Sequence, residues 1–173
     1  MNIELFPREK AVVDGQSITL GADRASVEVI LGAGEKVDNR AYYFDSILCV
    51  EYDEAKKVSF IEVSCGDPGS SVTVTIYDED IIKSGADPIL QILTEKNRGE
   101  VENENGYSYT FFNLSVGVYL EITPDDYKEL IEEMKANGDP VEGNPDVEAD
   151  FWKATHWATI GIGTSNYYRC VLN

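Results

Sequence analysis

The sequence predicts an α+β fold, in which antiparallel meander sheets carry helices packed on one face. Two observations support this class. Segments of alternating apolar and polar residues, typical of half-buried strands, follow one another closely over 41–77 and over 107–122. Segments with apolar residues three and four positions apart, typical of helices, stand at 23–31, 87–97 and 124–137. Because strands joined by short turns pair antiparallel, we expect meanders and not a parallel sheet.

The first half of the chain is expected to contain one helix followed by four strands. The helix over 23–31 has Asp23 as its cap and ends at Gly32. Its apolar stripe is formed by Val27, Ile30 and Leu31. The strands are expected at 41–44, 47–53, 57–65 and 71–77. Their adjacency predicts one meander.

The second half is expected to repeat this order of a helix before strands. A helix over 87–97 begins with Asp87 as its cap and Pro88 at its first position. Strands are expected at 107–112, 114–122, 157–163 and 166–172, with a short helix at 147–154. We expect a single domain over 1–173, and the repeated order allows two similar lobes at about 1–84 and 85–173.

The best-defined element of the sequence is a helix over 124–137. Thr123 caps it, Pro124 takes its first position and Gly138 ends it. Its apolar face is formed by Tyr127, Leu130, Ile131 and Met134. At about 100° per residue, the opposite face carries an acidic stripe of Asp125, Glu129 and Glu132, with Asp126 and Glu133 beside it. Like charges four positions apart slightly destabilise a helix, so the stripe is either a binding surface or the solvated face of an acidic protein.

The charge of the chain is strongly negative and unevenly distributed. The 173 residues include 32 Asp and Glu against 14 Lys and Arg, a formal net charge of −18. Residues 61–150 alone carry −16, whereas 151–173 carry +2. This balance opposes binding to phosphate backbones and to anionic membranes, so we expect no nucleic-acid and no membrane partner. We expect a basic protein partner. The alternative is that the negative charge reflects only the general acidity of bacterial cytosolic proteins.

Compartment signals favour the cytoplasm. The N-terminus has no apolar run after its first charged residues, and no window approaches the ~18 apolar residues of a membrane span. The cysteines, Cys49, Cys65 and Cys170, are odd in number and far apart, which predicts reduced thiols and no disulfide framework. We therefore expect a cytoplasmic protein.

The sequence offers little for catalysis, metal binding or a cofactor. His156 is the only histidine, so any serine or cysteine triad must use it, and Cys170 falls in an expected apolar strand. Asp78-Glu79-Asp80 begins like a calcium loop but lacks the glycine and the closing glutamate of that loop. One histidine and scattered cysteines form no zinc motif. We expect no enzyme, no metal and no cofactor.

Two surfaces are the expected partner-binding sites. One is acidic and is formed by Asp78, Glu79, Asp80, Asp125, Asp126, Glu129, Glu132 and Glu133. The other is aromatic and is formed by Trp152, Trp157, Tyr167 and Tyr168. Trp and Tyr bury much area with few rotatable bonds and are enriched in interface hot spots. The alternative for the aromatic group is that it closes the core of the second lobe.

Two parts of the chain resemble known families. Leu20-Gly21-Ala22-Asp23, Ile30-Leu31-Gly32 and the strand Val58-Ser59-Phe60-Ile61 lie within 17–65, and this region resembles the helix-plus-meander unit of β-lactamase-inhibitor-like and small assembly-lipoprotein domains. Those families usually have Ser or Thr where Asp23 stands, and the absence of a lipobox cysteine opposes the lipoprotein branch. The segment Ala158-Thr159-Ile160-Gly161-Ile162-Gly163, with Asn166-Tyr167-Tyr168, is similar to immunity proteins encoded beside bacterial polymorphic or contact-dependent toxins. The resemblances imply a cytoplasmic binding protein that neutralises a toxin domain.

The sequence thus leads to one preferred function and two alternatives. The preferred function is an acidic, non-catalytic inhibitor of a basic partner such as a toxin nuclease domain. One alternative is a generic protein-interaction or scaffold module, whose binding would not respond to reversal of the acidic charges. The other is an unrecognised hydrolase, in which His156→Ala would abolish turnover.

Overall fold

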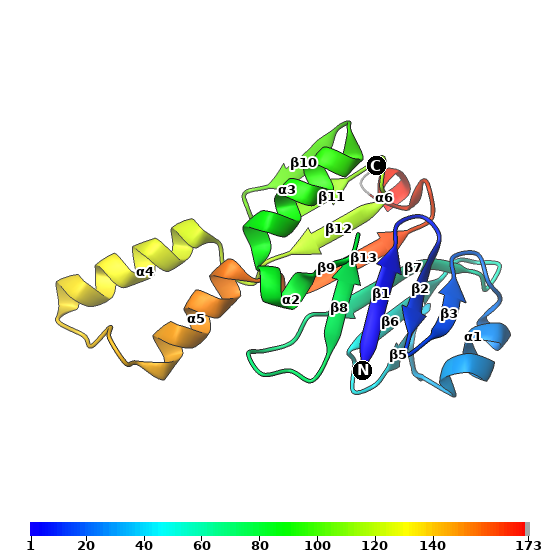
Figure 1. Cartoon of the computed structure of the whole chain (residues 1–173), viewed down its shortest axis with the longest axis horizontal. Coiled ribbons are helices and arrows are strands. Elements are labelled where there is room, and N and C mark those ends of the chain that lie inside the picture. Colours follow the sequence, from blue (N-terminus) through cyan, green and yellow to red (C-terminus); the bar gives the residue numbers. More distant parts are fainter. Residues whose placement is uncertain (172–173) are drawn as a thin grey trace.

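In the computed structural model, which describes residues 1–171 and the side chains of 1–169, thirteen strands form two sheets (Figure 1). The smaller sheet has the strand order β3-β2-β1-β8-β9. Its strands are β1 (Asn2–Phe6), β2 (Lys10–Val13), β3 (Gln16–Thr19), β8 (Thr73–Ile76) and β9 (Glu79–Asp80). All its neighbours are antiparallel except β1 and β8, which run parallel with Ile3 opposite Val74.

The larger sheet has eight strands, all paired antiparallel, in the order β10-β11-β12-β13-β7-β6-β5-β4. Its strands are β4 (Glu35–Val37), β5 (Arg40–Tyr43), β6 (Leu48–Tyr52), β7 (Val58–Ser64), β10 (Val101–Glu104), β11 (Ser108–Phe111), β12 (Val116–Tyr119) and β13 (Thr159–Gly163). Its middle pair, β7 and β13, places Ile61 opposite Ile162. This pair joins the two halves of the chain in one sheet.

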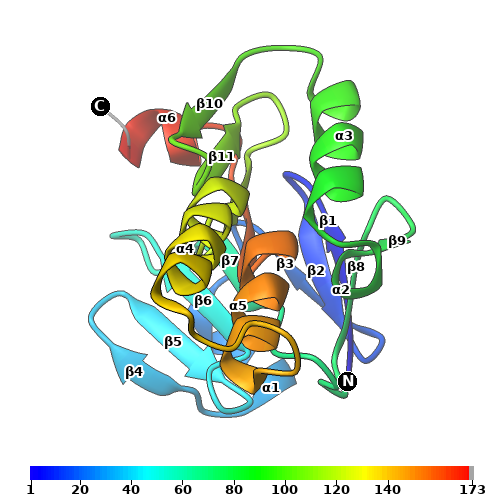
Figure 2. The same cartoon turned by 90° about the vertical axis from the view of Figure 1, so that its left-hand side faces the viewer.

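Six helices accompany the sheets within the described residues. They are α1 (Arg24–Leu31), α2 (Ile81–Ser84), α3 (Ala86–Asn97), α4 (Pro124–Asn137), α5 (Pro145–Thr155) and α6 (Tyr167–Val171). Figure 2 shows the smaller sheet and α3 on one side of the larger sheet, and α6 on its other side. Helices α4 and α5 project away from both layers (Figure 1).

The core lies between the two sheets and under α3. Alternate residues of the larger sheet, such as Leu48, Ile61 and Ile160, are fully buried against buried residues of the smaller sheet, such as Leu5. Leu93 of α3 belongs to the same apolar cluster. The other face of the larger sheet is called here the outer face. It is covered by α6 at one end, and it carries those residues of each strand that alternate with the core residues.

The predicted fold class is confirmed, and so are the main elements that local sequence specifies. The meander β5-β6-β7 contains three of the four strands expected in the first half. The prediction that the fourth, at 71–77, joins the same meander is wrong, because β8 lies in the smaller sheet and pairs parallel with β1. The helix predicted over 124–137 is α4, with Thr123 as its cap and Gly138 at its end.

The strand predicted at 166–172 is wrong over its described part, because residues 167–171 form α6. Both edges of β13 are already occupied, by β12 and by β7, so the following segment finds no free edge beside β13. The chain turns after β13 through a hydrogen bond from the Tyr167 amide to the Thr164 carbonyl, 3.0 Å long. Cys170 therefore lies in a helix and not in an apolar strand.

Of two predicted helix caps, one is confirmed in position and the other is wrong. Asp23 is the N-cap residue of α1, but its side chain makes no capping hydrogen bond, because its carboxylate pairs with the Lys57 ammonium at 2.8 Å. Helix α3 begins at Ala86, so Asp87 lies in its first turn and not at its cap. The cap position is held by Gly85, whose φ of 77° lets the chain pass directly from α2 into α3.

Candidate functional site

The most distinctive surface is a helical hairpin formed by α4 and α5, residues 124–155, called here the acidic arm. It joins β12 to β13, which are adjacent antiparallel strands with Tyr119 opposite Thr159. Such strands can be connected by a turn of two to five residues. The chain makes a long excursion instead, and the excursion projects from the sheets (Figure 1).

Local capping explains why the arm is helical. The Thr123 hydroxyl accepts a hydrogen bond from the Asp126 amide at 3.1 Å, and the Asp126 carboxylate accepts one from the Thr123 amide at 3.0 Å. Hydrogen bonds from the Thr123 hydroxyl and from Tyr107 hold the pKa of Asp126 below its usual range. Asn144 caps α5 through its side chain. Of the predicted acidic residues on α4, Asp126 is thus engaged in the fold.

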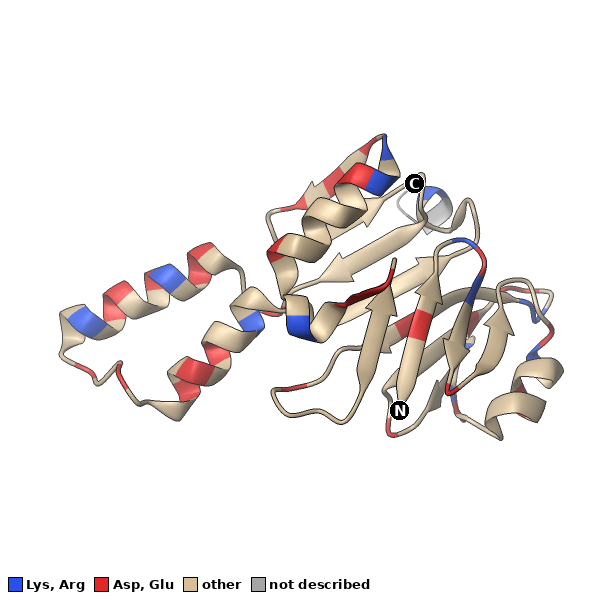
Figure 3. Ribbon diagram, viewed as in Figure 1, with Lys and Arg blue, Asp and Glu red and all other residues tan. Residues whose placement is uncertain are grey.

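The remaining predicted acids of α4 are available to a partner. Asp125, Glu129, Glu132 and Glu133 are all exposed. Residues 124–155 include ten Asp and Glu against three Lys, and Figure 3 shows acidic bands on both helices. The arm therefore presents concentrated negative charge on a part of the molecule that lies away from the sheets.

The apolar seam of the arm is only partly covered. No residue of α4 is buried, although Tyr127, Leu130, Ile131 and Met134 are all partly covered. The Tyr127 and Phe151 rings pack with centroids 5.6 Å apart, yet Phe151 is 53% exposed. Two helices alone cannot close a core, so the arm leaves aromatic surface beside its acidic surface.

Trp157, which was predicted as a partner contact, belongs to the core. Its side chain is 2% exposed, and its indole Nε1 donates a hydrogen bond to the Ala86 carbonyl at 3.2 Å. Its ring meets the Tyr109 ring edge-on at 5.8 Å. For Trp157, the alternative that the aromatic residues close the core is therefore correct. Its hydrogen bond fixes the base of the arm to the start of α3.

Trp152 and His156 form a second contact at the base of the arm. Their rings stack at 3.5 Å between centroids, and His156 Nδ1 lies 3.0 Å from the Thr155 hydroxyl and 3.2 Å from the Trp152 carbonyl. Burial lowers the pKa of His156, which favours the neutral ring. The partners of His156 are thus an aromatic ring, a hydroxyl and a carbonyl, and these fix its orientation at the end of α5.

The predicted acidic group Asp78-Glu79-Asp80 lies apart from the arm, in the turn and strand that precede α2. Asp80 caps α2 by accepting hydrogen bonds from the amides of Ile82 and Lys83, both 3.1 Å long. It also pairs with the Lys83 ammonium at 2.7 Å. Asp80 therefore has a local structural role, and Asp78 and Glu79 are the exposed members of this group.

Tyr167 and Tyr168 lie on the outer face of the larger sheet, far along the chain from the strands that they cover. The Tyr167 ring stacks on the Phe60 ring at 4.5 Å between centroids and 1° between planes, and Tyr168 meets Phe60 edge-on at 5.8 Å. Gly117 and Gly161 make room for these rings, since a Cβ at either position would overlap Tyr168 or Phe60. Both tyrosines are partly buried, so the aromatic group divides between the outer face, the arm base and the core.

The close approach of Phe60 to Gly161 gives a first prediction. Gly161→Ala should lower the free energy of unfolding by about 1–3 kcal/mol, because the new methyl group overpacks against the ring. Urea unfolding measures the change. In a Phe60→Leu background the same substitution should cost distinctly less, and an equal cost in both backgrounds would rule out this explanation.

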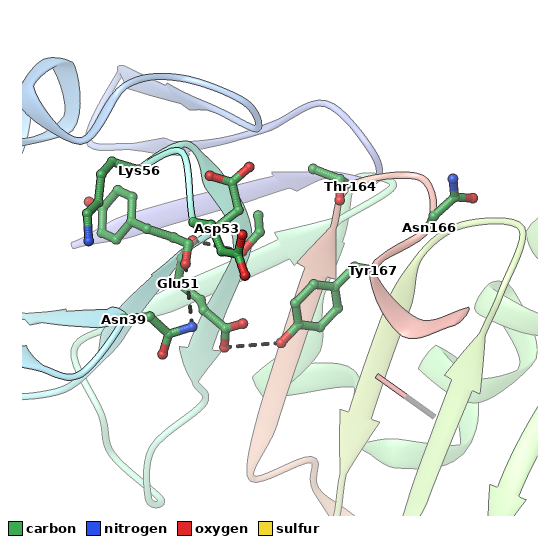
Figure 4. Close-up of a pocket in the computed structure, with 10 residues that line it drawn as sticks. Asn39, Glu51, Asp53, Lys56, Thr164, Asn166 and Tyr167 are labelled. Carbon is green, nitrogen blue, oxygen red and sulfur yellow. Dashed lines mark hydrogen bonds between the residues drawn. The ribbon is translucent and has the colours of Figure 1, made fainter. Parts of the chain in front are cut away.

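A pocket of about 460 Å³ lies beside Tyr167, between the β6-β7 turn and the start of α6 (Figure 4). Glu51 lines it, and one carboxylate oxygen of Glu51 accepts hydrogen bonds from Arg40 Nε at 2.9 Å and from the Tyr167 hydroxyl at 3.1 Å. Asp53 and Lys56 also line it. Sequence reasoning missed this site, because Arg40 and Glu51 meet only through strand pairing.

The described part of the chain shows neither a metal-binding cluster nor a membrane-spanning helix. Residues 1–171 contain no group of three or more His, Cys, Asp or Glu placed to hold a metal ion. None of their helices combines the length and the apolar character needed to cross a lipid bilayer. Comparisons with models of protein families, with curated proteins and with solved structures found no match to this chain.

Proposed function

We propose that the protein is a non-catalytic binding protein that neutralises a basic protein partner through the acidic arm. The observation that carries this proposal is the arm itself, a capped helical hairpin that concentrates acidic residues away from the sheets (Figure 3). A projecting anionic surface can enter a positively charged cleft and steer association to rates of ~10⁸ M⁻¹s⁻¹ at low salt.

A nucleic-acid-degrading toxin domain is the class of partner that this surface fits best. Such enzymes hold a phosphate backbone with basic residues, and an acidic arm offers carboxylates in place of phosphates. The free thiols of Cys49 and Cys65, both buried, are compatible with a reducing compartment such as the cytoplasm. The proposal is thus an immunity-type inhibitor that acts in the cytoplasm of a bacterium.

A second candidate is an interaction module without a neutralising role. The partly exposed seam of the arm favours it, since Phe151 is 53% exposed beside Tyr127. A partner held by this apolar surface would be insensitive to salt and to the acidic stripe.

Charge reversal on the arm tests the proposal. Glu129→Lys with Glu132→Lys should weaken binding to the basic product of the neighbouring gene by about tenfold or more at low salt, and should release its activity. Both side chains are exposed, so the fold should be retained. Affinity is measured by titration calorimetry at two salt concentrations, and inhibition in a nuclease assay.

A matched control reverses two exposed acids outside the arm, Glu4→Lys on β1 with Glu54→Lys in the β6-β7 turn. It brings the same change in net charge and should leave affinity nearly unchanged. Equal losses in both double variants would show that only overall charge matters. Unchanged affinity in the arm variant would favour the second candidate.

A further inference from the structure

The outer face of the larger sheet contains a second hollow, of about 250 Å³, beside α6. Tyr167 lines both this hollow and the pocket in Figure 4. The residues that matter here are Glu62, Phe60, Tyr168, Arg40, Ser108 and Thr159. None of them belongs to the acidic arm, so this hollow is independent of the proposed function.

Glu62 is the exceptional group in this hollow. It lies in the middle of the sheet, opposite Gly161 on one side and Cys49 on the other. Its side chain is partly buried, and among the described side chains nothing donates a hydrogen bond to its carboxylate. Burial raises the pKa of Glu62 above its usual range. A partly desolvated carboxylate without a partner costs stability, which makes it a candidate for ligand binding.

The nearest cation does not relieve Glu62. Arg40 lowers the pKa of Glu62 through its charge, but it places both Nε and Nη2 2.9 Å from the Glu51 carboxylate. The three charged groups Arg40, Glu51 and Glu62 therefore leave one negative charge unbalanced. One added cation at Glu62 would balance this part of the face.

The walls of the hollow favour a flat cation. Phe60 and Tyr168 supply aromatic rings, and Ser108 and Thr159 supply hydroxyl groups. A guanidinium group is more weakly hydrated than an ammonium group, which lowers the cost of placing it beside aromatic side chains, and it can donate two parallel hydrogen bonds to one carboxylate.

We propose that this hollow binds the guanidinium group of an arginine side chain presented by a protein partner, with Glu62 as its carboxylate acceptor. The Phe60 and Tyr168 side chains flank the guanidinium group, and the neighbouring hydroxyl groups accept its remaining N–H donors. The area is small, so it serves as an anchor for one side chain and not as an entire interface.

The test uses N-acetyl-arginine amide as the probe and the uncharged N-acetyl-citrulline amide as its matched control. Carboxyl-detected NMR of the full chain follows the Glu62 side chain. The arginine probe should shift the Glu62 carboxyl resonance saturably, and the citrulline probe should not. Equal shifts with both probes would overturn the proposal, as would no shift with either.

Two variants complete this experiment. Glu62→Gln should weaken probe binding about tenfold or more. Glu54→Gln, at an exposed carboxylate that lines the other pocket, should leave binding unchanged. Loss of binding in Glu54→Gln alone would assign the probe to the pocket in Figure 4 and would overturn the proposal.

Stability provides a separate readout for Glu62. The groups that face it are Arg40 on β5, Cys49 and Glu51 on β6, and Tyr168 on α6. Because the pKa of Glu62 is raised on folding, ionisation costs stability as pH rises above the unfolded pKa. Glu62→Gln should therefore raise Tm at pH 7, and the gain should shrink as the solution is acidified and wild-type Glu62 becomes protonated. A fall in Tm at pH 7 would show that the carboxylate has a structural partner.

Discussion

Replacement of residues 124–155 by a short Gly/Ser linker is expected to abolish binding to a basic partner while both sheets stay folded. The strands at the base of the arm are already paired, with Tyr119 opposite Thr159 and a 2.8 Å hydrogen bond from the Ala158 amide to the Tyr119 carbonyl. No residue of α4 is buried, and the two buried residues of α5, Val147 and Ala154, do not belong to the apolar cluster between the sheets, so removal of the arm leaves that cluster intact.

Three measurements check this expectation. Far-UV circular dichroism should show loss of helix with the strand signal retained, and amide NMR should keep the resonances of β5, β6, β7 and β13. Titration with the partner should show no binding. A variant that unfolds would show that the arm supports the sheets, and a folded variant that binds with full affinity would exclude the arm as the interface.

Trp157→Ala is expected to have the largest effect on stability, a loss of about 3–5 kcal/mol in the free energy of unfolding. The indole is 2% exposed and packs edge-on against Tyr109. Its hydrogen bond to the Ala86 carbonyl ties the base of the arm to α3, so truncation both leaves a cavity and removes this hydrogen bond.

Trp157→Phe separates these two contributions. It keeps an aromatic ring but loses the Nε1 donor, so it should cost distinctly less than the alanine variant. Urea unfolding monitored by circular dichroism gives both values. A loss below about 1 kcal/mol for Trp157→Ala would show that the surrounding residues close over the site without cost.

Local signals were sufficient to predict the two helices of the arm from sequence, but not that they form a projecting hairpin. Thr123, Pro124 and Gly138 mark both ends of α4, and each acts within one helical turn. The prediction of α5 was likewise close, over 147–154 against Pro145–Thr155. Elements of this kind depend on neighbours in the chain, which the sequence displays directly.

The smaller sheet could not be predicted in this way. Strands β1, β2 and β3 were not expected, although Ile3, Leu5, Val13 and Ile18 are buried. They are short, and the pairing of β1 with β8 is parallel across some 70 residues, with Asn2 opposite Thr73. Such a pair is fixed by tertiary packing against the larger sheet and not by turn signals.

On the outer face, the sequence likewise identified single residues of the candidate sites but not the partners that tertiary packing brings to them. Tyr167 and Tyr168 were singled out as aromatic residues, but their partners Phe60 and Glu51 come from strands more than 100 positions earlier. Nothing in the sequence distinguishes Glu62 from the other acidic residues of the chain. Its position in the sheet, opposite Gly161, is set by strand pairing and leaves its carboxylate without a hydrogen-bond donor among the described side chains.

The pairing of β7 with β13 has a consequence for synthesis of the chain on the ribosome. Ser64 of β7 cannot pair until Thr159 of β13 has been synthesised, about 95 residues later. At typical rates of 5–20 residues per second, this delay lasts roughly 5–20 s. During this interval one edge of β7 has unpaired amides and carbonyls between apolar residues such as Ile61 and Val63. An edge of this kind can pair with other chains. The nascent protein thus passes through a period in which a chaperone, or fast elongation, would protect it from aggregation.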